Sequence, residues 1–163
     1  MTDLGTLGGT FSYAYAINDA GQVTGQSYLT GNGVSDAFLY SAGRMTDLGR
    51  LAGRYGSEGR GINASGEVTG DSNGRAFLYD AGTLYDLSTL VSSGLSSGVF
   101  LADANGINDN GWIVADGSNG QAYLLEPTAP EPTVPEPASI ALLALGAGVA
   151  ATLAGRRRKP TAS

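Results

Sequence analysis

The sequence lacks both cysteine and histidine. Without cysteine the chain forms no disulfide and offers no thiol nucleophile, and without histidine it has neither the most common general base nor a common zinc ligand. Basic residues are scarce as well. Residues 1–137 contain five of them against all fifteen acids, which gives this part a formal charge of −10. Because so acidic a body repels a phosphate backbone, we expect no nucleic-acid partner.

Glycine, by contrast, is abundant, with 26 residues, and glycines recur at matching positions of a sequence repeat. The phrase AINDAGQVTG at residues 16–25 returns as GINASGEVTG at 61–70 and as GINDNGWIVA at 106–115, in two steps of 45 residues. A second phrase, DAFLYSAGRMTDLG at 36–49, returns as RAFLYDAGTLYDLS at 75–88. Periods of this length are typical of repeat architectures.

Each repeat unit is predicted to form four short strands. In the first unit, one strand ends near Ile17, one begins at Gln22, one covers Ala37–Tyr40 and one covers Arg44–Leu48. The Asn, Asp and Gly residues between them favour tight turns, because Asn and Asp bond their own backbone and glycine accepts a positive φ. Helical periodicity is missing. Four antiparallel strands in about 40–45 residues have the size of one β-propeller blade.

The predicted fold is therefore all-β, a partial β-propeller of about three four-stranded repeats over residues 1–125. Three repeats are fewer than the four to eight that normally close a ring. Met1 aligns with Met45 inside a repeat, and no basic and apolar signal peptide is seen at the start, so we expect further repeats upstream. A short open solenoid or stacked meander is the alternative fold. The units are expected at about residues 1–44, 45–83 and 84–125.

Apolar residues recur at fixed positions of the units, as a shared core requires. We expect these positions to be buried, and each fully buried side chain to contribute roughly 1.5–3 kcal/mol. The recurring sets are Leu4, Leu48 and Leu87; Leu7, Leu51 and Leu90; Ile17, Ile62 and Ile107; Val23, Val68 and Ile113; and Phe38, Phe77 and Tyr123.

Polar residues recur too, and their types favour turn capping and backbone hydrogen bonds. Calcium binding is the alternative, since Asp and Asn oxygens are hard ligands. However, the D-x-D-x-D-G pattern is absent, and Ala64 replaces the second acid in the middle repeat, so we predict no metal site. Gly25 and Gly70 are expected to be close-packing or bulge positions. The recurring polar residues are Asn18, Asn63 and Asn108, and Asp3, Asp47 and Asp86.

The C-terminal region has three parts of different composition. Residues 126–137 read EPTAPEPTVPEP and hold five of the six prolines, which favours an extended linker. Residues 138–155 carry no charge, and as a helix they would span about 27 Å, close to the roughly 30 Å of a bilayer core. We therefore predict one transmembrane helix there. The tail at 156–163 begins with Arg156, Arg157, Arg158 and Lys159, which the positive-inside rule places in the cytoplasm.

This order of parts resembles the PEP-CTERM sorting signal of Gram-negative bacteria, from Val134 to Lys159. The resemblance implies that exosortase, a membrane-embedded protease, recognises Pro135, Glu136 and Pro137 and removes the tail. It also implies passage through the inner membrane to the cell surface or the extracellular space. Proteins with this signal are often associated with extracellular polysaccharide.

The repeats are similar to the HAF repeats of extracellular bacterial proteins. The phrases DLGTLGG, AINDAGQVTG and AFLY carry the similarity. It implies a propeller-like β fold and brings no established enzymatic activity. The chain departs from the family where the histidine that names the repeat is replaced by Asp36, Arg75 and Gln121, so no role of that histidine is carried over.

The sequence therefore predicts an exported, exosortase-processed and non-catalytic surface or matrix protein without a cofactor. A glycan- or calcium-binding propeller module is the first alternative, because exposed aromatic residues are common sugar platforms. A propeller glycosidase is the second, and it requires two facing carboxylates about 5–9.5 Å apart. The aromatic candidates are Tyr13, Tyr15, Tyr28 and Tyr55.

Overall fold

The computed structural model describes residues 1–53, 55–127 and 145–147. In these ranges the chain forms three antiparallel sheets of four strands and one short helix. Sheet A contains β1 (Gly8–Ile17), β2 (Val23–Leu29), β3 (Ser35–Ser41) and β4 (Arg44–Gly49). Sheet B contains β5 (Ser57–Ile62), β6 (Val68–Ser72), β7 (Arg75–Asp80) and β8 (Thr83–Asp86). After α1 (Leu87–Leu90), sheet C contains β9 (Leu101–Ile107), β10 (Ile113–Gly117), β11 (Ala122–Pro127) and β12 (Leu145–Ala147).

The all-β prediction is confirmed, and the strands of sheet A lie close to the four predicted ones. Sheets A and B are simple meanders, in which strands adjacent in sequence are adjacent in space. The predicted units begin a new repeat at residue 45, whereas the structure places that segment in β4, at the end of sheet A. β11 also continues through Glu126 and Pro127, the first two residues of the predicted linker.

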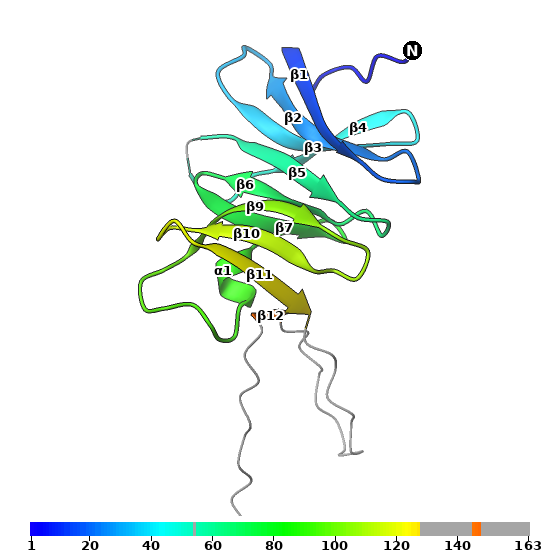
Figure 1. Cartoon of the computed structure of the whole chain (residues 1–163). Coiled ribbons are helices and arrows are strands. Elements are labelled where there is room, and N and C mark those ends of the chain that lie inside the picture. The colour runs from blue at the N-terminus through cyan, green and yellow to red at the C-terminus, as the bar shows by residue number, and fades with distance from the viewer. Residues whose placement is uncertain (54, 128–144, 148–163) are drawn as a thin grey trace, which may run out of the picture.

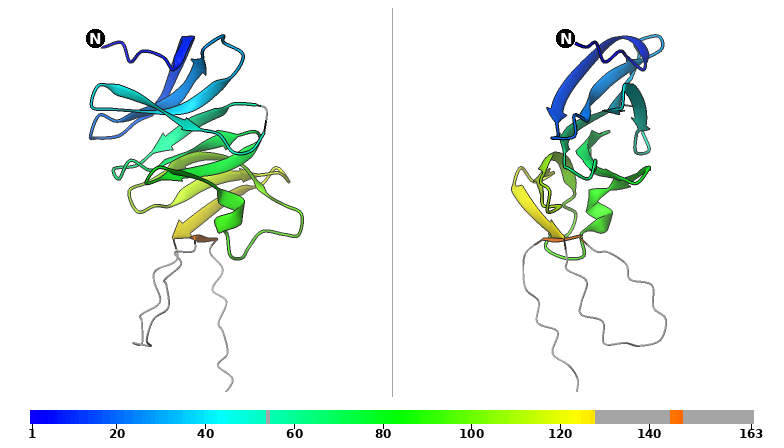
Figure 2. Two further views of the ribbon diagram at one scale, coloured as in Figure 1. Left: turned by 180° about the vertical axis from the view of Figure 1, so that it is seen from behind. Right: turned by 90° about the vertical axis from the view of Figure 1, so that its right-hand side faces the viewer.

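The three sheets are stacked in chain order, with sheet B in the middle (Figures 1 and 2). β5 packs on β1, β2 and β3 of sheet A, and β9 packs on β5, β6 and β7 of sheet B. The first strands of neighbouring sheets therefore contact one another in series and build a common edge. The fourth strands lie at the opposite edge of each sheet.

The sheets are held together by two apolar cores, one on each side of sheet B. Between sheets A and B, the fully buried Val68 and Phe77 pack with Ala37 and Leu48. Between sheets B and C, the core is formed by Ala76, Leu78, Leu87, Leu101, Ala104, Ile113, Ala115 and Leu125.

The prediction of a buried core is wrong at Ile17, whose side chain is 68% exposed. The equivalent Ile62 is only 8% exposed, because sheet A covers it. Ile17 lies on the side of sheet A that faces away from sheet B, so no described sheet covers it. Seven further members of the recurring sets are only half-buried, namely Leu4, Leu7, Val23, Leu51, Leu90, Ile107 and Tyr123.

The recurring asparagines cap turns, as predicted, and they also connect the sheets. The Oδ1 atoms of Asn18, Asn63 and Asn108 each accept a backbone N–H from the following turn. In addition, Asn18 Nδ2 donates to the carbonyl oxygen of Asn63 at 2.8 Å, and Asn63 Nδ2 donates to that of Asn108 at 3.4 Å. These two bonds join positions 45 residues apart, so the sequence period is the period of the stack.

The recurring aspartates have the predicted structural role as well. The Oδ1 atoms of Asp3 and Asp47 accept the backbone N–H groups of Gly5 and Gly49, at 2.9 and 2.7 Å. Asp86 caps α1 in the same way. The prediction for Gly25 and Gly70 is also confirmed, because a Cβ atom at either position would collide with a carbonyl oxygen of the neighbouring strand.

The predicted transmembrane helix at 138–155 is not found where the structure describes this stretch. Residues Leu145–Ala147 form β12, which pairs with β11 from Leu125 to Pro127. The physical reason is that β11 would otherwise leave its outer backbone N–H and C=O groups unpaired. No helix in the described ranges is long and apolar enough to cross a bilayer. The remainder of residues 128–163, including most of the predicted linker and the basic tail, lies outside the described residues.

Phe77→Ala is expected to lower the free energy of unfolding by about 3–5 kcal/mol, because the side chain is fully buried between sheets A and B. Phe11→Ala is the matched control. Its side chain is 56% exposed, so we expect a loss of about 1 kcal/mol or less. Urea unfolding followed by circular dichroism measures both values, and equal losses in the two variants would contradict this core assignment.

Candidate functional site

The first strand of each sheet contains a β-bulge at the same position of the repeat. The pairing of β1 with β2 skips from Ala14 to Ala16, and the pairings of β5 and β9 skip at the equivalent places. The extra residues are Tyr15, Arg60 and Asn105, which are 45 residues apart in sequence. A bulge turns its side chain away from the regular alternation of a strand. Because β1, β5 and β9 build a common edge, these three residues form a row along it, here called the bulge row.

The bulge row is bordered by a cavity of about 490 Å³ that is lined by Tyr15, Glu58, Arg60 and Asn105. The Tyr15 hydroxyl accepts a hydrogen bond from Gln26 Nε2 at 2.7 Å. Asn105 Nδ2 donates to Asp116 Oδ2 at 2.8 Å. The site therefore presents an aromatic ring, a guanidinium and an amide side by side, and each polar group is already oriented by a neighbour.

Arg60 is the cation at the centre of an acidic cluster. Its guanidinium pairs with Glu58 of the same strand and with Asp103 of β9, the latter at 3.1 Å. Burial lowers the pKa of Arg60, but the carboxylates of Asp103 and Glu58 raise it further than burial lowers it. The ion pair with Asp103 thus connects sheets B and C at the common edge.

Two carboxyl groups of this cluster bind protons more tightly than usual. Burial raises the pKa of Asp71, and the nearby charge of Asp103 raises it further. Burial also raises the pKa of Asp103, and Arg60 offsets part of this effect. Oδ1 of Asp103 is buried without a hydrogen-bond partner among the described residues. The cluster therefore holds more negative charge than Arg60 neutralises.

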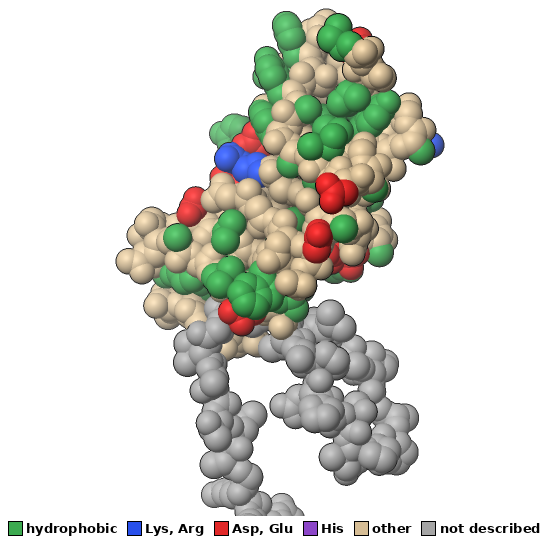
Figure 3. All heavy atoms as spheres, turned by 45° about the vertical axis from the view of Figure 1, so that its right-hand side comes forward, with side chains coloured by type: hydrophobic (Ala, Val, Ile, Leu, Met, Phe, Trp, Pro, Cys, Tyr) green, Lys and Arg blue, Asp and Glu red, His purple; other side chains and the backbone are tan. Residues whose placement is uncertain are grey.

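A second cavity of about 520 Å³ begins at Glu58 and continues between sheets A and B. Its polar lining includes Gln26, Ser35, Asp71 and Asn73, and Tyr55 also lines it. The two cavities share Glu58 and together form a polar surface next to the bulge row. Figure 3 shows basic and acidic side chains next to one another at the left edge of the view, and further acidic side chains below the hydrophobic ones of the upper part of the molecule.

Three of the four predicted aromatic candidates are accessible. Tyr13 and Tyr15 are 49% and 47% exposed on β1, and Tyr55 is 79% exposed in the connection to β5. Tyr28 is half-buried and packs edge-on against Phe11, with ring centroids 6.1 Å apart. Tyr15 thus belongs to the polar site, Tyr13 is exposed two residues earlier on β1, and Tyr28 supports the sheet.

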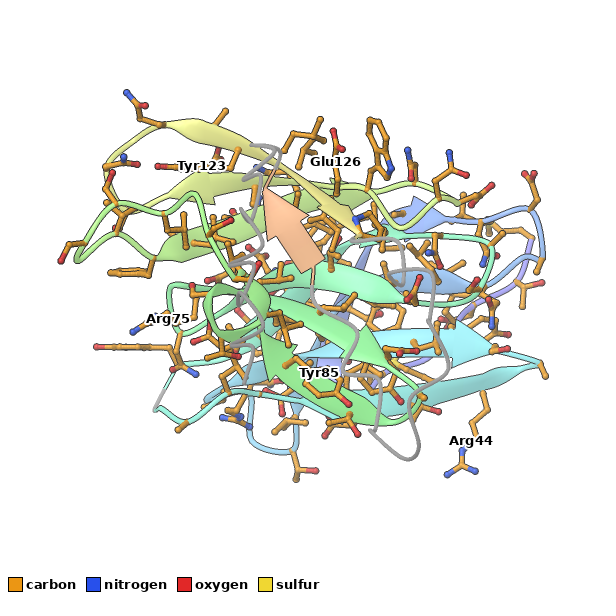
Figure 4. All side chains as sticks on the ribbon, turned by 90° about the horizontal axis from the view of Figure 1, so that it is seen from below. Arg44, Arg75, Tyr85, Tyr123 and Glu126 are labelled. Carbon is orange, nitrogen blue, oxygen red and sulfur yellow. The ribbon has the colours of Figure 1, made fainter. Side chains whose placement is uncertain are left out.

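Asp36 and Arg75, two of the three residues at one recurring position of the repeats, make structural contacts. Asp36 is buried, and it pairs with Arg50 at 2.8 Å. Burial raises the pKa of Asp36, and the nearby Asp47 adds to the effect, while Arg50 opposes it. Arg75 lies over the ring of Phe100, at 4.2 Å from its centroid, and reaches Asp86. Arg44, in contrast, points away from the fold into solvent (Figure 4).

The described residues do not support a metal site or a hydrolase nucleophile elbow. No three Asp or Glu side chains there come together in a way that could hold a metal ion. The run Gly94-Leu95-Ser96-Ser97-Gly98 matches the letters of a hydrolase nucleophile elbow, which requires a strand before the serine and a helix after it. Here the run lies in the loop between α1 and β9, so that geometry is missing.

Sequence reasoning missed the bulge row, although a signal for it exists. Aligning the chain on its 45-residue period places Tyr15, Arg60 and Asn105 in one column. The flanking columns hold small residues such as Ala14, Gly59 and Ala104, whereas this column holds three large and chemically different side chains. Nothing in the sequence, however, reveals that the strand is bulged there.

Lowering the pH from 7 toward about 4 is expected to raise the melting temperature. Asp36, Asp71 and Asp103 have raised pKa values in the folded state, so folding is favoured when they are protonated, and this contribution is lost as the pH rises through their folded pKa values. Asp71→Asn should reduce the dependence on pH. Thermal unfolding followed by circular dichroism is the measurement, and an unchanged pH profile in Asp71→Asn would contradict the assignment.

The predicted sorting residues Pro135, Glu136 and Pro137 and the basic cluster from Arg156 to Lys159 lie outside the described residues. Both groups of residues, however, lie within a segment that matches a known sequence family. The model of the PEP-CTERM protein-sorting motif matches residues 133–159. Neither a curated protein nor a solved structure gives a significant match to the chain. The chain thus carries an all-β repeat body followed by a PEP-CTERM sorting motif, which supports an exported protein that is targeted to exosortase.

Proposed function

We propose that the chain is a non-catalytic protein of the cell surface or extracellular matrix, whose β-repeat body is exported and then separated from its sorting tail by exosortase. The observation that carries the proposal is the sorting motif at residues 133–159, directly after an acidic repeat body. In this proposal Pro135, Glu136 and Pro137 are the residues that exosortase recognises.

The charge distribution supports the proposed topology. Residues 1–137 have a formal charge of −10, and the four basic residues Arg156 to Lys159 follow the uncharged stretch 138–155. Basic residues next to an apolar segment stay in the cytoplasm. The proposal therefore places the C-terminus in the cytoplasm and the repeat body on the periplasmic side until cleavage.

The arrangement of the sheets supports a propeller-like body of HAF-type repeats. In the described residues each sheet has its first strand at a common edge and its fourth strand at the opposite edge, which is how blades surround an axis. The three sheets form an open stack, so a closed ring would require further sheets of the same kind.

Glu136→Ala is expected to block removal of the tail, because it removes the only charge of the Pro-Glu-Pro at 135–137. The test expresses the chain with a C-terminal tag in a host that has exosortase, fused to an export signal if the chain needs one. Tagged precursor should accumulate in the inner-membrane fraction of the variant, whereas the unaltered chain loses its tag.

The sequence offers a matched control, because a second Pro-Glu-Pro lies at residues 130–132, outside the matched motif. Glu131→Ala should leave processing unchanged. A tag that stays on the unaltered surface protein contradicts the proposed processing. Equal effects of Glu131→Ala and Glu136→Ala contradict the assignment of 135–137 as the recognised residues.

A second candidate function is favoured by the bulge row. We propose that this edge of the repeat body binds a glycan, because the exposed ring of Tyr15 lines a cavity together with Glu58, Arg60 and Asn105. Tyr13, two residues earlier on β1, is exposed as well. Aromatic rings stack on the apolar faces of sugars, and amide and charged groups bond their hydroxyls. This candidate specifies a role for the exported body and is compatible with the first proposal.

Tyr15→Ala is expected to weaken glycan binding at least about tenfold, since it removes the aromatic surface beside the cavity. Tyr85→Ala is the control, because Tyr85 is 39% exposed on β8, away from the bulge row. A glycan array identifies the ligand, and calorimetry with that glycan compares the variants. An array without any binding, or equal losses in both variants, would contradict this candidate.

A further inference from the structure

The outer face of sheet A carries a row of apolar residues that crosses all four strands. Ile17 of β1 is opposite Val23 of β2, Val23 is opposite Tyr40 of β3, and Tyr40 is opposite Met45 of β4. Residues directly opposite one another in an antiparallel sheet share a face. This row, here called the leading row, is uncovered at Ile17, which is 68% exposed, and only half-buried at Val23, Tyr40 and Met45.

The equivalent rows of the other sheets are interfaces. In sheet B the row is Ile62, Val68, Tyr79 and Leu84. Ile62 and Val68 are buried in the core between sheets A and B, and Tyr79 and Leu84 are half-buried and pack against it. In sheet C it includes Ile107, which is half-buried against the core between sheets B and C, and Ile113 and Leu125, each 1% exposed. The same structural row is therefore covered twice inside the chain, each time by the sheet that precedes it.

Sheet C presents the complementary surface at the other end of the stack. Val114 and Leu124 are 49% and 43% exposed. The equivalents of Val114 are Thr24 and Thr69, which are fully buried between sheets. The equivalent of Leu124 in sheet B is Leu78, which packs in the core against sheet C. The outer face of sheet C therefore corresponds to the faces that cover a leading row elsewhere in the chain.

The hydrogen bonds between repeats all run in one direction along the stack, from a donor in one sheet to an acceptor in the next sheet. Each asparagine side chain donates to the carbonyl of the asparagine 45 residues later, from Asn18 to Asn63 and from Asn63 to Asn108. The next donor in this series is the side chain of Asn108, at the sheet C end. The next acceptor is the carbonyl of Asn18, at the sheet A end. A contact of sheet C with sheet A thus continues the apolar rows and the asparagine series together.

The first residues of the chain bond to sheet A in the same way as the connection between sheets A and B bonds to sheet B. Ser12 Oγ donates to the Gly5 carbonyl, as Ser57 Oγ does to that of Gly49, where β4 passes into the connection to sheet B. Leu7 N likewise donates to Ser27 Oγ at 2.8 Å, as Leu51 N does to Ser72 Oγ at 2.9 Å. The leading side of sheet A therefore already makes the contacts of a segment that arrives from a preceding sheet.

We propose that the chain associates head to tail with second copies of itself, the outer face of sheet C of one copy packing on the leading row of the next. Such a contact uses two different surfaces, so a pair of copies still has one free surface of each kind. Repetition of the contact builds a closed ring if the rotation allows it, and an open chain if it does not.

The test uses the full chain in a mild detergent, because residues 138–155 are apolar and would otherwise aggregate. Light scattering after size exclusion gives the protein mass in each particle over a range of concentrations. Ile17→Asp and Val114→Asp should each weaken association at least about tenfold, because each places a charge in an apolar contact. Tyr55→Asp is the control at a residue 79% exposed outside both faces. Unchanged melting temperatures show that the variants fold.

A mixture of Ile17→Asp and Val114→Asp separates this arrangement from the alternatives. Each variant alone should be a monomer, whereas the mixture should form a dimer and nothing larger, because one intact face of each kind remains. A Val114→Asp chain that still dimerises alone would indicate a symmetric contact and overturn the proposal. A monomeric unaltered chain, or association that neither variant weakens, as expected if the apolar tail alone holds copies together, would overturn it as well.

Discussion

The packing of one four-stranded sheet on the next is the interaction on which the rest of the structure depends. Each sheet is too small to bury its own apolar residues, so Val68 and Phe77 become solvent-free only when sheet A covers them. Sheet C depends on sheet B in the same way, through Ile113 and Leu125. The 45-residue period is the sequence record of this packing, and the asparagine bonds between repeats fix the register in which one sheet lies on the next.

This dependence also explains which parts of the fold could be predicted from the sequence. Strands, turns and capping residues follow from local chemistry that each repeat carries, and Asp3, Asn18 and Gly25 have the roles that their types indicate. The exposure of Ile17 could not be predicted, because its residue type matches the buried Ile62 and only the missing neighbour differs. The bulge row was also missed, because the 45-residue alignment marks the column of Tyr15, Arg60 and Asn105 but does not show that each strand is bulged there. The sorting motif was visible in sequence because it is read as a linear signal.

The body and the tail of the chain are built on different principles. The body is acidic and rich in glycine, and it folds through contacts between distant residues, whereas the matched motif at 133–159 is a linear arrangement of proline, apolar and basic segments. A protease can recognise such a linear segment independently of the fold that precedes it. Three acidic residues of the body, Glu58, Asp71 and Asp103, lie around Arg60 at the common edge, where the ion pair of Arg60 with Asp103 connects two sheets. The sorting motif and the charged cluster around Arg60 thus lie in separate parts of one polypeptide.

The most direct measurement of the stacked arrangement is amide hydrogen exchange of the folded, monomeric chain, resolved by residue. Exchange reports the free energy of local opening, which is highest where packing covers both faces of a sheet. The arrangement predicts the slowest exchange in β6 of the central sheet, at Val68–Ser72, and faster exchange in the equivalent strands β2 and β10 of the outer sheets. Exchange in β6 that is as fast as in β2 and β10 would contradict a stack with sheet B at its centre.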